Sequence, residues 1–207
     1  MVEENVKTLT VNNYKISDFN ELLRLQRLAF PLPYPEEQLW NIDQIRSHVT
    51  TFPEGAIAIW DGNEIVGSTT LIKKNGLCLD QSWEEASGNG YIDEVHVEDG
   101  DYLYGIDICS NPFRKGEGIA RKLVEESIKL SRDLGLRGVI EGSRIPGYIQ
   151  YKDVLDVHAY IDKVIKGELN DPTFSFFLKF NPKILKIKED YLNDPESMNY
   201  GVLILLK

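Results

Sequence analysis

Two closely spaced glycines in a basic loop are the residues of this chain whose types and spacing most directly suggest chemistry. Gly116 and Gly118 follow a segment rich in β-branched and aromatic residues, 102–110, and precede helically spaced apolar residues in 119–134. A strand that runs through such a loop into a helix leaves backbone N–H groups unpaired at the positive end of the helix dipole. The sequence therefore predicts a binding site for a pyrophosphate-bearing cofactor. The loop is flanked by the basic side chains of Arg114, Lys115 and Arg121.

The loop differs from two familiar phosphate-binding motifs. A P-loop requires Gly-x-x-x-x-Gly-Lys-Ser/Thr, and this run is absent from the chain. A Rossmann fingerprint requires three glycines early in a βαβ unit and an acidic residue about twenty positions later. Here the loop has two glycines and lies past the midpoint of the 207-residue chain. A nucleotide-phosphate enzyme is also disfavoured, because no metal-binding acidic motif accompanies the loop.

The segment 115–120, Lys-Gly-Glu-Gly-Ile-Ala, resembles the acetyl-CoA loop of the GNAT superfamily of N-acetyltransferases. The signature of that loop is Gln/Arg-x-x-Gly-x-Gly/Ala, so Lys115 replaces the usual first residue. The resemblance covers nearly the whole chain and is more particular in several further stretches. They are similar to the GNAT-type domain often joined to a carbon–nitrogen hydrolase (nitrilase-like) domain, and they comprise residues 52–55, 61–68, 138–148, 159–172 and 194–200.

The resemblance implies a fold of the α/β (α+β) class and a single GNAT-type domain over residues 1–207. In that fold a mixed, mostly antiparallel central sheet is flanked by helices, and strands four and five splay around acetyl-CoA. The pantetheine arm would bond to backbone at the end of strand four, and the pyrophosphate would lie on the loop N–H groups. The implied cofactor-binding residues are Ile108, Cys109, Ser110, Arg114, Lys115, Gly116, Glu117, Gly118, Ile119, Ala120 and Arg121.

Direct attack of an amine on the thioester of acetyl-CoA is the chemistry that the resemblance implies. An alkyl ammonium must first lose a proton, which a carboxylate can accept. Asp107, just before the cofactor segment of strand four, is the predicted base, with a purely structural carboxylate as the alternative. Glu141, at the end of strand five, is the second candidate base. Tyr148, in the turn beyond strand five, is the predicted acid for the thiolate, with Tyr151 and Tyr160 as competing candidates. Arg144 in the same turn either binds an anion or fixes that turn.

The spacing of apolar residues and the positions of Gly and Pro predict the strands and helices that must position these residues. Strands are predicted at residues 6–11, 55–60, 64–73, 91–97, 102–110, 138–141, 184–188 and 200–206. Helices are predicted from Ser17-Asp18 to residue 29, from Pro35 to about residue 49, over 119–134 and behind Asp171-Pro172. Asp61-Gly62-Asn63 predicts a hairpin turn.

Composition is typical of a soluble globular protein, with 42% hydrophobic and 27% charged residues. The two cysteines show no disulfide framework, which favours a cytoplasmic location. A net charge of −10 argues against a nucleic-acid partner and favours cationic ligands. Acidic residues within 93–107 predict a solvated loop, with a substrate funnel as the alternative. The cysteines and histidines lack ligand spacing, so no metal site is expected. No run approaches the roughly 18 apolar residues of a membrane span, so no membrane partner is expected.

Two function classes remain open from the sequence. The first is an acetyl-CoA-dependent N-acetyltransferase acting on a primary amine, either a small molecule or a protein amino group. The second is a non-catalytic acyl-CoA-binding module that regulates or scaffolds a partner, for example a carbon–nitrogen hydrolase. The first is favoured, and a homodimer remains open for both.

Overall fold

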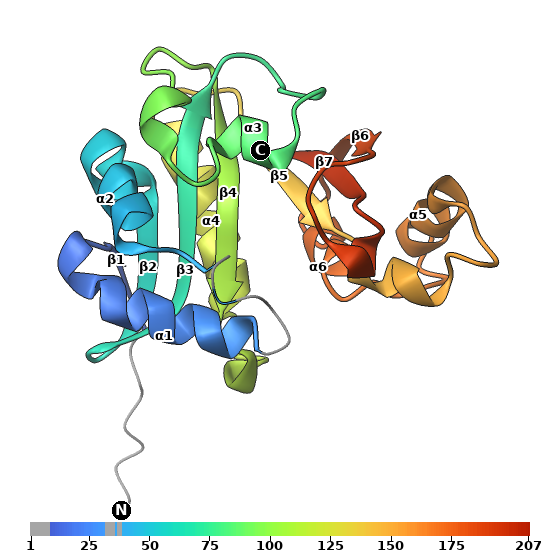
Figure 1. Cartoon of the computed structure of the whole chain (residues 1–207), viewed down its shortest axis with the longest axis horizontal. Coiled ribbons are helices and arrows are strands. Elements are labelled where there is room, and N and C mark those ends of the chain that lie inside the picture. The colour runs from blue at the N-terminus through green and yellow to red at the C-terminus, as the bar shows by residue number, and fades with distance from the viewer. Residues whose placement is uncertain (1–8, 32–35, 37–38) are drawn as a thin grey trace, which may run out of the picture.

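A seven-stranded sheet forms the centre of the computed structural model, which describes residues 9–31, 36 and 39–207 (Figure 1). The strand order is β1-β2-β3-β4-β5-β7-β6, and β4 and β5 are parallel neighbours. The other neighbouring pairs are antiparallel. This mixed sheet with flanking helices confirms the predicted fold class.

The helices and strands have the following bounds. The strands are β1 (Thr10–Asn13), β2 (Ala56–Asp61), β3 (Glu64–Lys74), β4 (Tyr102–Ser110), β5 (Val139–Arg144), β6 (Lys183–Lys188) and β7 (Gly201–Leu206). The α-helices are α1 (Phe19–Ala29), α2 (Ile42–Thr51), α3 (Trp83–Ser87), α4 (Ile119–Asp133), α5 (Val157–Ile165) and α6 (Phe174–Leu178).

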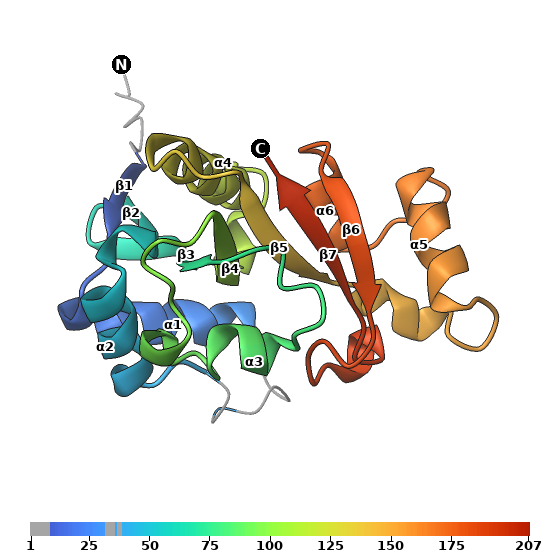
Figure 2. The same ribbon diagram turned by 90° about the horizontal axis from the view of Figure 1, so that it is seen from above.

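Helices lie on both faces of the strands β2 to β4, with α1, α2 and α3 opposite α4 (Figure 2). On the α4 face, a Cβ at Gly67 of β3 would meet Ile119 and Leu123, so the glycine lets helix and sheet approach closely. On the other face, the Tyr14 hydroxyl bonds to His48 Nδ1 of α2 (3.0 Å) and to the Thr70 hydroxyl of β3 (2.8 Å). The two faces of β3 therefore contact different helices.

Two predicted elements are wrong where local hydrogen bonds override propensity. The second helix begins at Ile42, well after the predicted start, because the Asn41 side chain accepts the N–H groups of Asp43 and Gln44. The predicted start at Pro35 lies outside the described residues, but positions 39–41 are not helical. The predicted strand 91–97 contains the 3₁₀ helix η4 (Ile92–Glu94), whose backbone is held by the Ser47 hydroxyl and a turn rather than by a ladder.

Other local predictions hold. The turn after Asp61 joins β2 and β3 into an antiparallel hairpin, and Gly62 has φ of +60°. Helix α4 buries one face, on Ile119, Leu123 and Val124. The predicted first strand extends to residues outside the described range, and its described part is β1.

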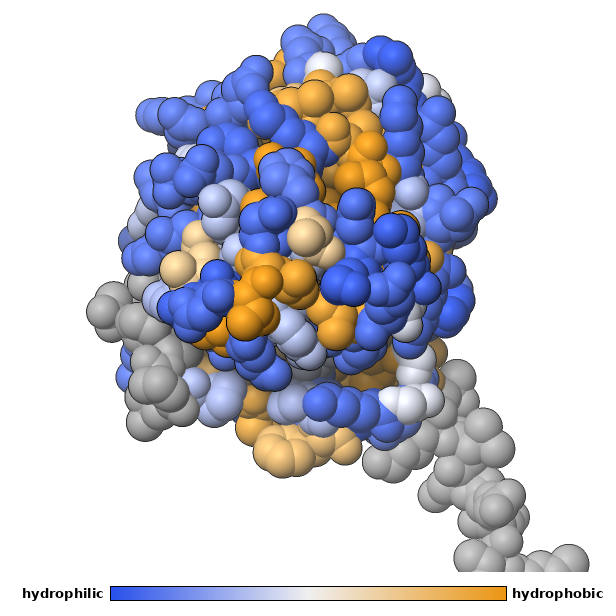
Figure 3. All heavy atoms as spheres, turned by 90° about the vertical axis from the view of Figure 1, so that its right-hand side faces the viewer, coloured by the Kyte–Doolittle hydropathy of each residue, from blue (hydrophilic) through white to orange (hydrophobic). Residues whose placement is uncertain are grey.

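The C-terminal part of the chain places α5, α6, β6 and β7 beyond β5 (Figures 1 and 2). Figure 3 looks onto this side and shows apolar patches interrupted by hydrophilic side chains. Large apolar side chains near α5 are exposed, with Val154 at 75% and Ile165 at 46%. The structure adds no evidence on a second copy, so the homodimer stays a prediction.

Candidate active site

The parallel pairing of β4 with β5 ends early. It joins Leu103 to Val139 and ends with Gly105 opposite Glu141, although both strands continue. At the same point β4 contains a bulge, because Leu71 of β3 pairs with Gly105 whereas Thr70 pairs with Asp107. The residue skipped by this register is Ile106. We call this part of β4 and the side chains around it the bulge site; it comprises Tyr104, Ile106, Asp107, Trp40, Trp83 and Tyr191.

Beyond the bulge, β4 has a free edge toward β5. Asn111 N donates to Val66 O on β3 at 2.9 Å. Alternate residues of a strand direct their backbone groups to opposite edges, so Ile108 and Ser110 direct theirs away from β3. These are the two residues expected to bond to pantetheine, and β5 does not pair with them. Between them, the Cys109 side chain is buried at 3% exposure, which raises its pKa.

Asp107 lies directly after the bulge, and the Trp40 indole is the donor that acts on its carboxyl group. The Oδ2 atom of Asp107 is buried, and no described residue forms a hydrogen bond of ordinary distance and angle with it. Burial raises the pKa of Asp107 to about 7, and the hydrogen bond from the Trp40 indole lowers it by less. Trp40 Nε1 is buried too and forms no hydrogen bond of ordinary geometry with the described residues. A carboxyl group with a pKa near neutrality can accept a proton at physiological pH.

Glu141 is a second buried carboxyl group, at the last position where β5 pairs with β4. The residue is 5% exposed, and a Cβ on Gly105 would collide with its carboxylate. Glycine at position 105 therefore provides the space that the carboxyl group occupies. Burial, followed by the charge of Asp107, raises the pKa of Glu141 to about 8. The structure thus brings the two predicted bases within electrostatic range of each other.

Four aromatic residues around these carboxyl groups were missed by the sequence reasoning. The Tyr104 and Tyr191 hydroxyls bond to each other at 2.8 Å, and Tyr191 lies so close to β5 that a Cβ at Gly142 would collide with it. Trp83 Nε1 donates to Ile106 O at 2.9 Å, and its ring stacks on Trp40 at 6.1 Å. No local motif marks these residues, because they come from four separate segments.

Tyr148, the predicted acid, lies in the 3₁₀ helix η6 (Pro146–Gln150) after β5. Its hydroxyl donates to Leu155 O at 3.2 Å, and its ring lies 5.2 Å from that of Tyr160 and 6.1 Å from that of Tyr200. Burial raises the pKa of Tyr148. The described hydrogen bonds of Tyr148 connect it to residues within 145–155. Its catalytic role stays a prediction.

The glycine loop leads into α4 as the sequence reasoning expected. Gly116 and Gly118 have φ values of +94° and +76°, and a Cβ at either would meet nothing within 4 Å. Gly118 is the N-cap of α4, no side chain caps the first turn, and the first turn contains no acidic residue. Lys115 is exposed beside them. This terminus can accept an anion on its backbone N–H groups.

The basic residues of the loop differ in their surroundings. Arg114 donates to Asp61 at 2.8 Å and to Glu117 at 2.9 Å, and both bonds raise its pKa. Its charge is therefore partly neutralised by two carboxylates. Arg121 is half exposed, lies 5.3 Å from the Phe180 ring and pairs with Glu125 at 3.5 Å. The contributions of both to anion binding stay predictions.

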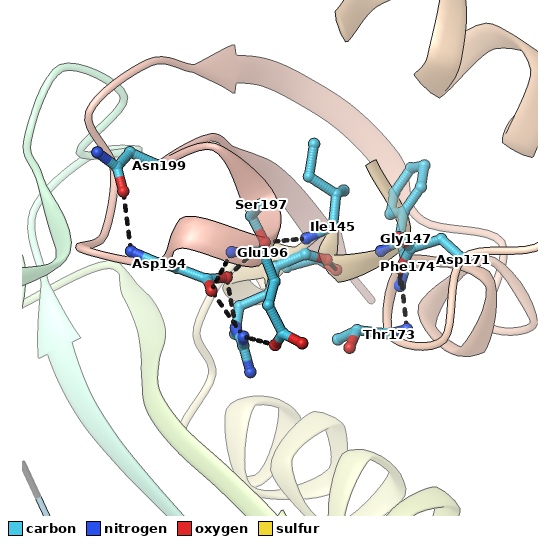
Figure 4. Close-up of polar contacts among 11 residues, drawn as sticks. Ile145, Gly147, Asp171, Thr173, Phe174, Asp194, Glu196, Ser197 and Asn199 are labelled. Atoms are coloured by element: carbon cyan, nitrogen blue, oxygen red, sulfur yellow. Dashed lines mark hydrogen bonds and ion pairs between the residues drawn. The ribbon is translucent and has the colours of Figure 1, made fainter. Parts of the chain in front are cut away.

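Arg144 is held by acidic residues of the segment before β7. Its guanidinium donates to both carboxylate oxygens of Asp194 (2.7 and 2.8 Å) and to Glu196 (2.9 Å) (Figure 4). Asp194 also accepts the Ser197 hydroxyl, and the Ser197 hydroxyl accepts Ile145 N. Despite burial, these bonds keep the pKa of Asp194 below its usual value. Of the two predicted roles of Arg144, the contacts favour fixing the turn.

Two surface depressions lie away from the bulge site. One of about 170 Å³ lies between the C-terminal half of α4 and the end of β7, and one of about 500 Å³ lies between α5 and α6. Neither is lined by Asp107, Glu141 or the α4 N-terminus. Among residues 9–31, 36 and 39–207, no three acidic, His or Cys side chains form a metal-binding group. In the same ranges, no helix has the length and apolar composition needed to cross a bilayer.

Comparison with known proteins places this geometry in a family. The family model described as "Acetyltransferase (GNAT) family" matches residues 19–145, which include the bulge site except Tyr191, and the whole glycine loop. The chain belongs to the GNAT acetyltransferase family. It is a GNAT acyltransferase, and the glycine loop before α4 and the early end of β4–β5 pairing lie within the matched segment.

Two relatives of this GNAT chain come from Bacillus subtilis (strain 168). The "Uncharacterized N-acetyltransferase YkwB" is 36% identical over 200 residues, which are 96% of this chain and 88% of YkwB. The "Probable hydrolase YhcX" is 30% identical over 201 residues, which are 96% of this chain but 38% of YhcX. The hydrolase-named relative is consistent with the resemblance to fused domains but does not establish that branch.

Solved structures of GNAT-like proteins share the fold. The GphF GNAT-like decarboxylase in complex with isobutyryl-CoA has a TM-score of 0.79 at 20% identity, covering 95% of this chain and 98% of GphF. The loading GNATL domain of CurA from Lyngbya majuscula has the same TM-score and identity, covering 97% of this chain and 98% of that domain. At this identity the likeness supports the fold alone.

Proposed function

We propose that this chain, as one GNAT domain, transfers an acetyl group from acetyl-CoA to a primary amine by direct attack. The observation that carries the proposal is the Asp107 carboxyl group. It lies at the bulge where β4 leaves β5, and no hydrogen bond of ordinary geometry holds its buried Oδ2 atom in the described structure. Leaving a buried carboxylate oxygen unpaired is costly for stability, so such a group is a candidate for function.

Asp107 is the base in this proposal. The acceptor arrives as an ammonium, Asp107 takes one proton from it, and the neutral nitrogen attacks the acyl carbon of the thioester. The carbon–sulfur bond then breaks, and Tyr148 keeps the proposed role of donating a proton to the leaving thiolate. Acetyl-CoA supplies the activated acyl group. Glu141, whose pKa is raised to about 8, stays protonated at neutral pH and so leaves Asp107 as the ionised partner.

Backbone groups of β4 and α4 bind and orient the donor. The free-edge groups of Ile108 and Ser110 can pair with an extended amide-containing arm as a further strand would. They can also polarise the acyl carbonyl, which stabilises the developing oxyanion. The uncapped first turn of α4 and the loop with Gly116 and Gly118 accept the pyrophosphate.

A thermal-unfolding scan tests donor binding. A ligand at a hundred times its dissociation constant adds about 2.7 kcal/mol of stability. Acetyl-CoA is expected to raise the unfolding midpoint, whereas ATP and NAD at equal concentration are not. No shift with millimolar acetyl-CoA would contradict the proposal.

A pair of glycine variants locates the donor. Gly118→Glu places a bulky negative side chain at the N-terminus of α4, and we expect about a hundredfold weaker acetyl-CoA binding by titration calorimetry. Gly135→Glu is the matched control, because Gly135 also has positive φ and open space but lies past the other end of α4. Equal affinity in the two variants would remove the loop from the site.

The second candidate is an acyl-CoA-binding module without catalysis. It is favoured by the relative YhcX, which is named a probable hydrolase and of which this chain matches 38%. Binding of acetyl-CoA without CoA release, across a panel of amines, would favour this candidate over the transferase.

A further inference from the structure

The glycine loop between β4 and α4 is poorly supported by packing. A Cβ at Gly116 or Gly118 would meet no described heavy atom within 4 Å, and Phe113 is 82% exposed. The backbone hydrogen bond from Glu117 N to Arg114 O is long, at 3.4 Å. A segment with little packing and exposed backbone bonds opens locally at a low cost in free energy. A pyrophosphate, however, needs the N–H groups of the loop held in one arrangement.

The Arg114 side chain connects this loop to the central sheet. Its Nη1 atom donates to Asp61 Oδ2 at 2.8 Å, across 53 positions of the sequence. Asp61 is the last residue of β2 and pairs with Glu64 of β3, so the strand ladder fixes its backbone. The β2–β3 turn and the glycine loop lie at the same end of the sheet (Figure 1). Arg114 therefore ties the loop to a hairpin of the sheet.

The same guanidinium also holds the residue between the two glycines. Arg114 Nε donates to both carboxylate oxygens of Glu117 at 2.9 Å, and Nη2 contacts the same carboxylate. The Arg114 and Asp61 side chains are only 14% and 16% exposed, which limits screening of their ion pair by solvent. A planar guanidinium that bonds two carboxylates fixes their relative positions. The hairpin and the centre of the loop are thus joined through one side chain.

This arrangement bears on what Arg114 contributes to anion binding. Two carboxylates bind the one guanidinium, so its positive charge is compensated within the cluster of Asp61, Arg114 and Glu117. A compensated charge adds little attraction for a phosphate. Holding the loop in place remains as the contribution that these contacts support. A loop that is ordered before the ligand arrives avoids the entropy cost of ordering it on binding.

We propose that Arg114 is a positioning residue, which joins Asp61 of β2 to Glu117 and so holds the glycine loop in the arrangement that accepts the pyrophosphate of acetyl-CoA. This inference rests on the proposed function, since it concerns binding of the same donor. It differs from a direct contact between the guanidinium and the phosphate oxygens. It also adds Asp61, which lies on the hairpin, to the residues on which donor binding depends.

Asp61→Asn separates the two roles by the sign of its effect. If Arg114 bound phosphate directly, loss of the Asp61 charge would release the guanidinium and tighten binding. Positioning requires the opposite, and we expect about fivefold weaker acetyl-CoA binding by titration calorimetry at constant ionic strength. Equal or tighter binding by Asp61→Asn would overturn the inference while donor binding stands. No binding of acetyl-CoA by the wild-type chain would overturn the proposed function as well.

Two further hairpin variants control for charge and shape. Glu64→Gln removes the same charge from the position paired with Asp61, but Glu64 pairs with Arg24 of α1 at 3.2 Å. Asp61→Glu keeps the carboxylate. We expect both variants to bind acetyl-CoA within about twofold of the wild-type affinity. A loss in either variant equal to that in Asp61→Asn would assign the effect to the charge or shape of the hairpin and overturn the role of the ion pair.

Hydrogen exchange of the ligand-free protein tests the arrangement of the loop without any donor. Peptides covering 113–118 are expected to exchange about fivefold faster in Asp61→Asn than in the wild type, whereas β2 and β3 exchange at wild-type rates. Unchanged exchange in the loop would overturn the inference. Faster exchange throughout the sheet would show a general loss of stability and would overturn it too.

A double-mutant cycle tests whether Asp61 acts through Arg114. In the background of Arg114→Gln, the further change Asp61→Asn is expected to weaken acetyl-CoA binding by less than about twofold, because its partner is already absent. Full additivity of the two substitutions would show that they act independently and would overturn the inference.

Discussion

Two aspartates with buried carboxylate oxygens have opposite surroundings in this protein. Asp171 is fully buried, and its carboxylate accepts Gly147 N, Thr173 N, Phe174 N and the Tyr160 hydroxyl at 2.8–2.9 Å (Figure 4). Asp107 has a buried oxygen that forms no hydrogen bond of ordinary geometry with the described residues, and the Trp40 indole is the donor that lowers its pKa. A buried carboxylate with four donors joins the segments that supply them, whereas burial with few donors raises the pKa of Asp107 toward neutrality.

The two carboxyl groups differ in whether their hydrogen bonds join separate segments of the chain. Asp171 joins the turn before Tyr148 to α5 and the start of α6, so its bonds span separate segments of the C-terminal part. Asp194 and Glu196 also join separate segments, because both accept hydrogen bonds from Arg144 at the end of β5. Asp107 belongs to a strand that the fold already secures through β3, so its side chain is not needed for that pairing. The same substitution at the two positions therefore separates stability from activity.

Asp107→Asn is expected to have the largest effect, on rate. Loss of a general base typically lowers kcat by about 10²- to 10⁴-fold. Acetyl-CoA affinity and the unfolding midpoint should stay at or above the wild-type values, because an unsatisfied carboxylate is removed. Steady-state kinetics and a thermal scan of the same preparation measure both. Wild-type kcat would remove Asp107 from the mechanism.

Asp171→Asn is expected to act mainly on stability. An amide in place of the carboxylate leaves some of the four donors unsatisfied, which costs about 3 kcal/mol. For a domain of this size the midpoint should fall by about 10 °C. Urea unfolding measures the loss of unfolding free energy, with Asp107→Asn as the control. An equal unfolding midpoint for Asp171→Asn and Asp107→Asn would contradict the comparison of the two aspartates.

The pH dependence of stability gives the smallest and most specific test. Burial raises the pKa values of Asp107 to about 7 and of Glu141 to about 8, so the native state retains protons that the unfolded chain has already released. Their contribution to stability is therefore present below the ordinary carboxyl pKa and is lost as pH rises toward 7 or 8. The pKa of Asp194 is lowered, so its contribution is lost at acidic pH instead.

We expect the unfolding midpoint of Asp107→Asn to fall less than that of the wild type between pH 5 and 8. In the same range, wild-type kcat/KM should rise about tenfold per pH unit up to about pH 7, as Asp107 ionises. Thermal scans and rate profiles at constant ionic strength measure these changes. Parallel midpoint curves for the two proteins would show that Asp107 does not titrate in this range.

Much of the fold could be predicted from local pattern. The β2–β3 hairpin, β4, the glycine loop and α4 each depend on residues close in sequence, such as Gly62 and Gly118, whose positive φ suits glycine. The start of α2 and the strand at 91–97 were mispredicted, because Asn41 and Ser47 satisfy backbone groups through side-chain hydrogen bonds. Such bonds compete with propensity and have weak sequence signals.

The sequence by itself determined that a strand, a glycine loop and an amphipathic helix follow one another, because backbone geometry and hydrophobic period act over short distances. It also supplied Asp107, Glu141 and Tyr148 as candidates. Only the tertiary structure decided what surrounds them. Trp40, Trp83 and Tyr191 come from distant segments, and their convergence on the β4 bulge depends on how the sheet and helices pack. Burial, which raises the pKa of Asp107, arises from that packing and has no counterpart in local sequence.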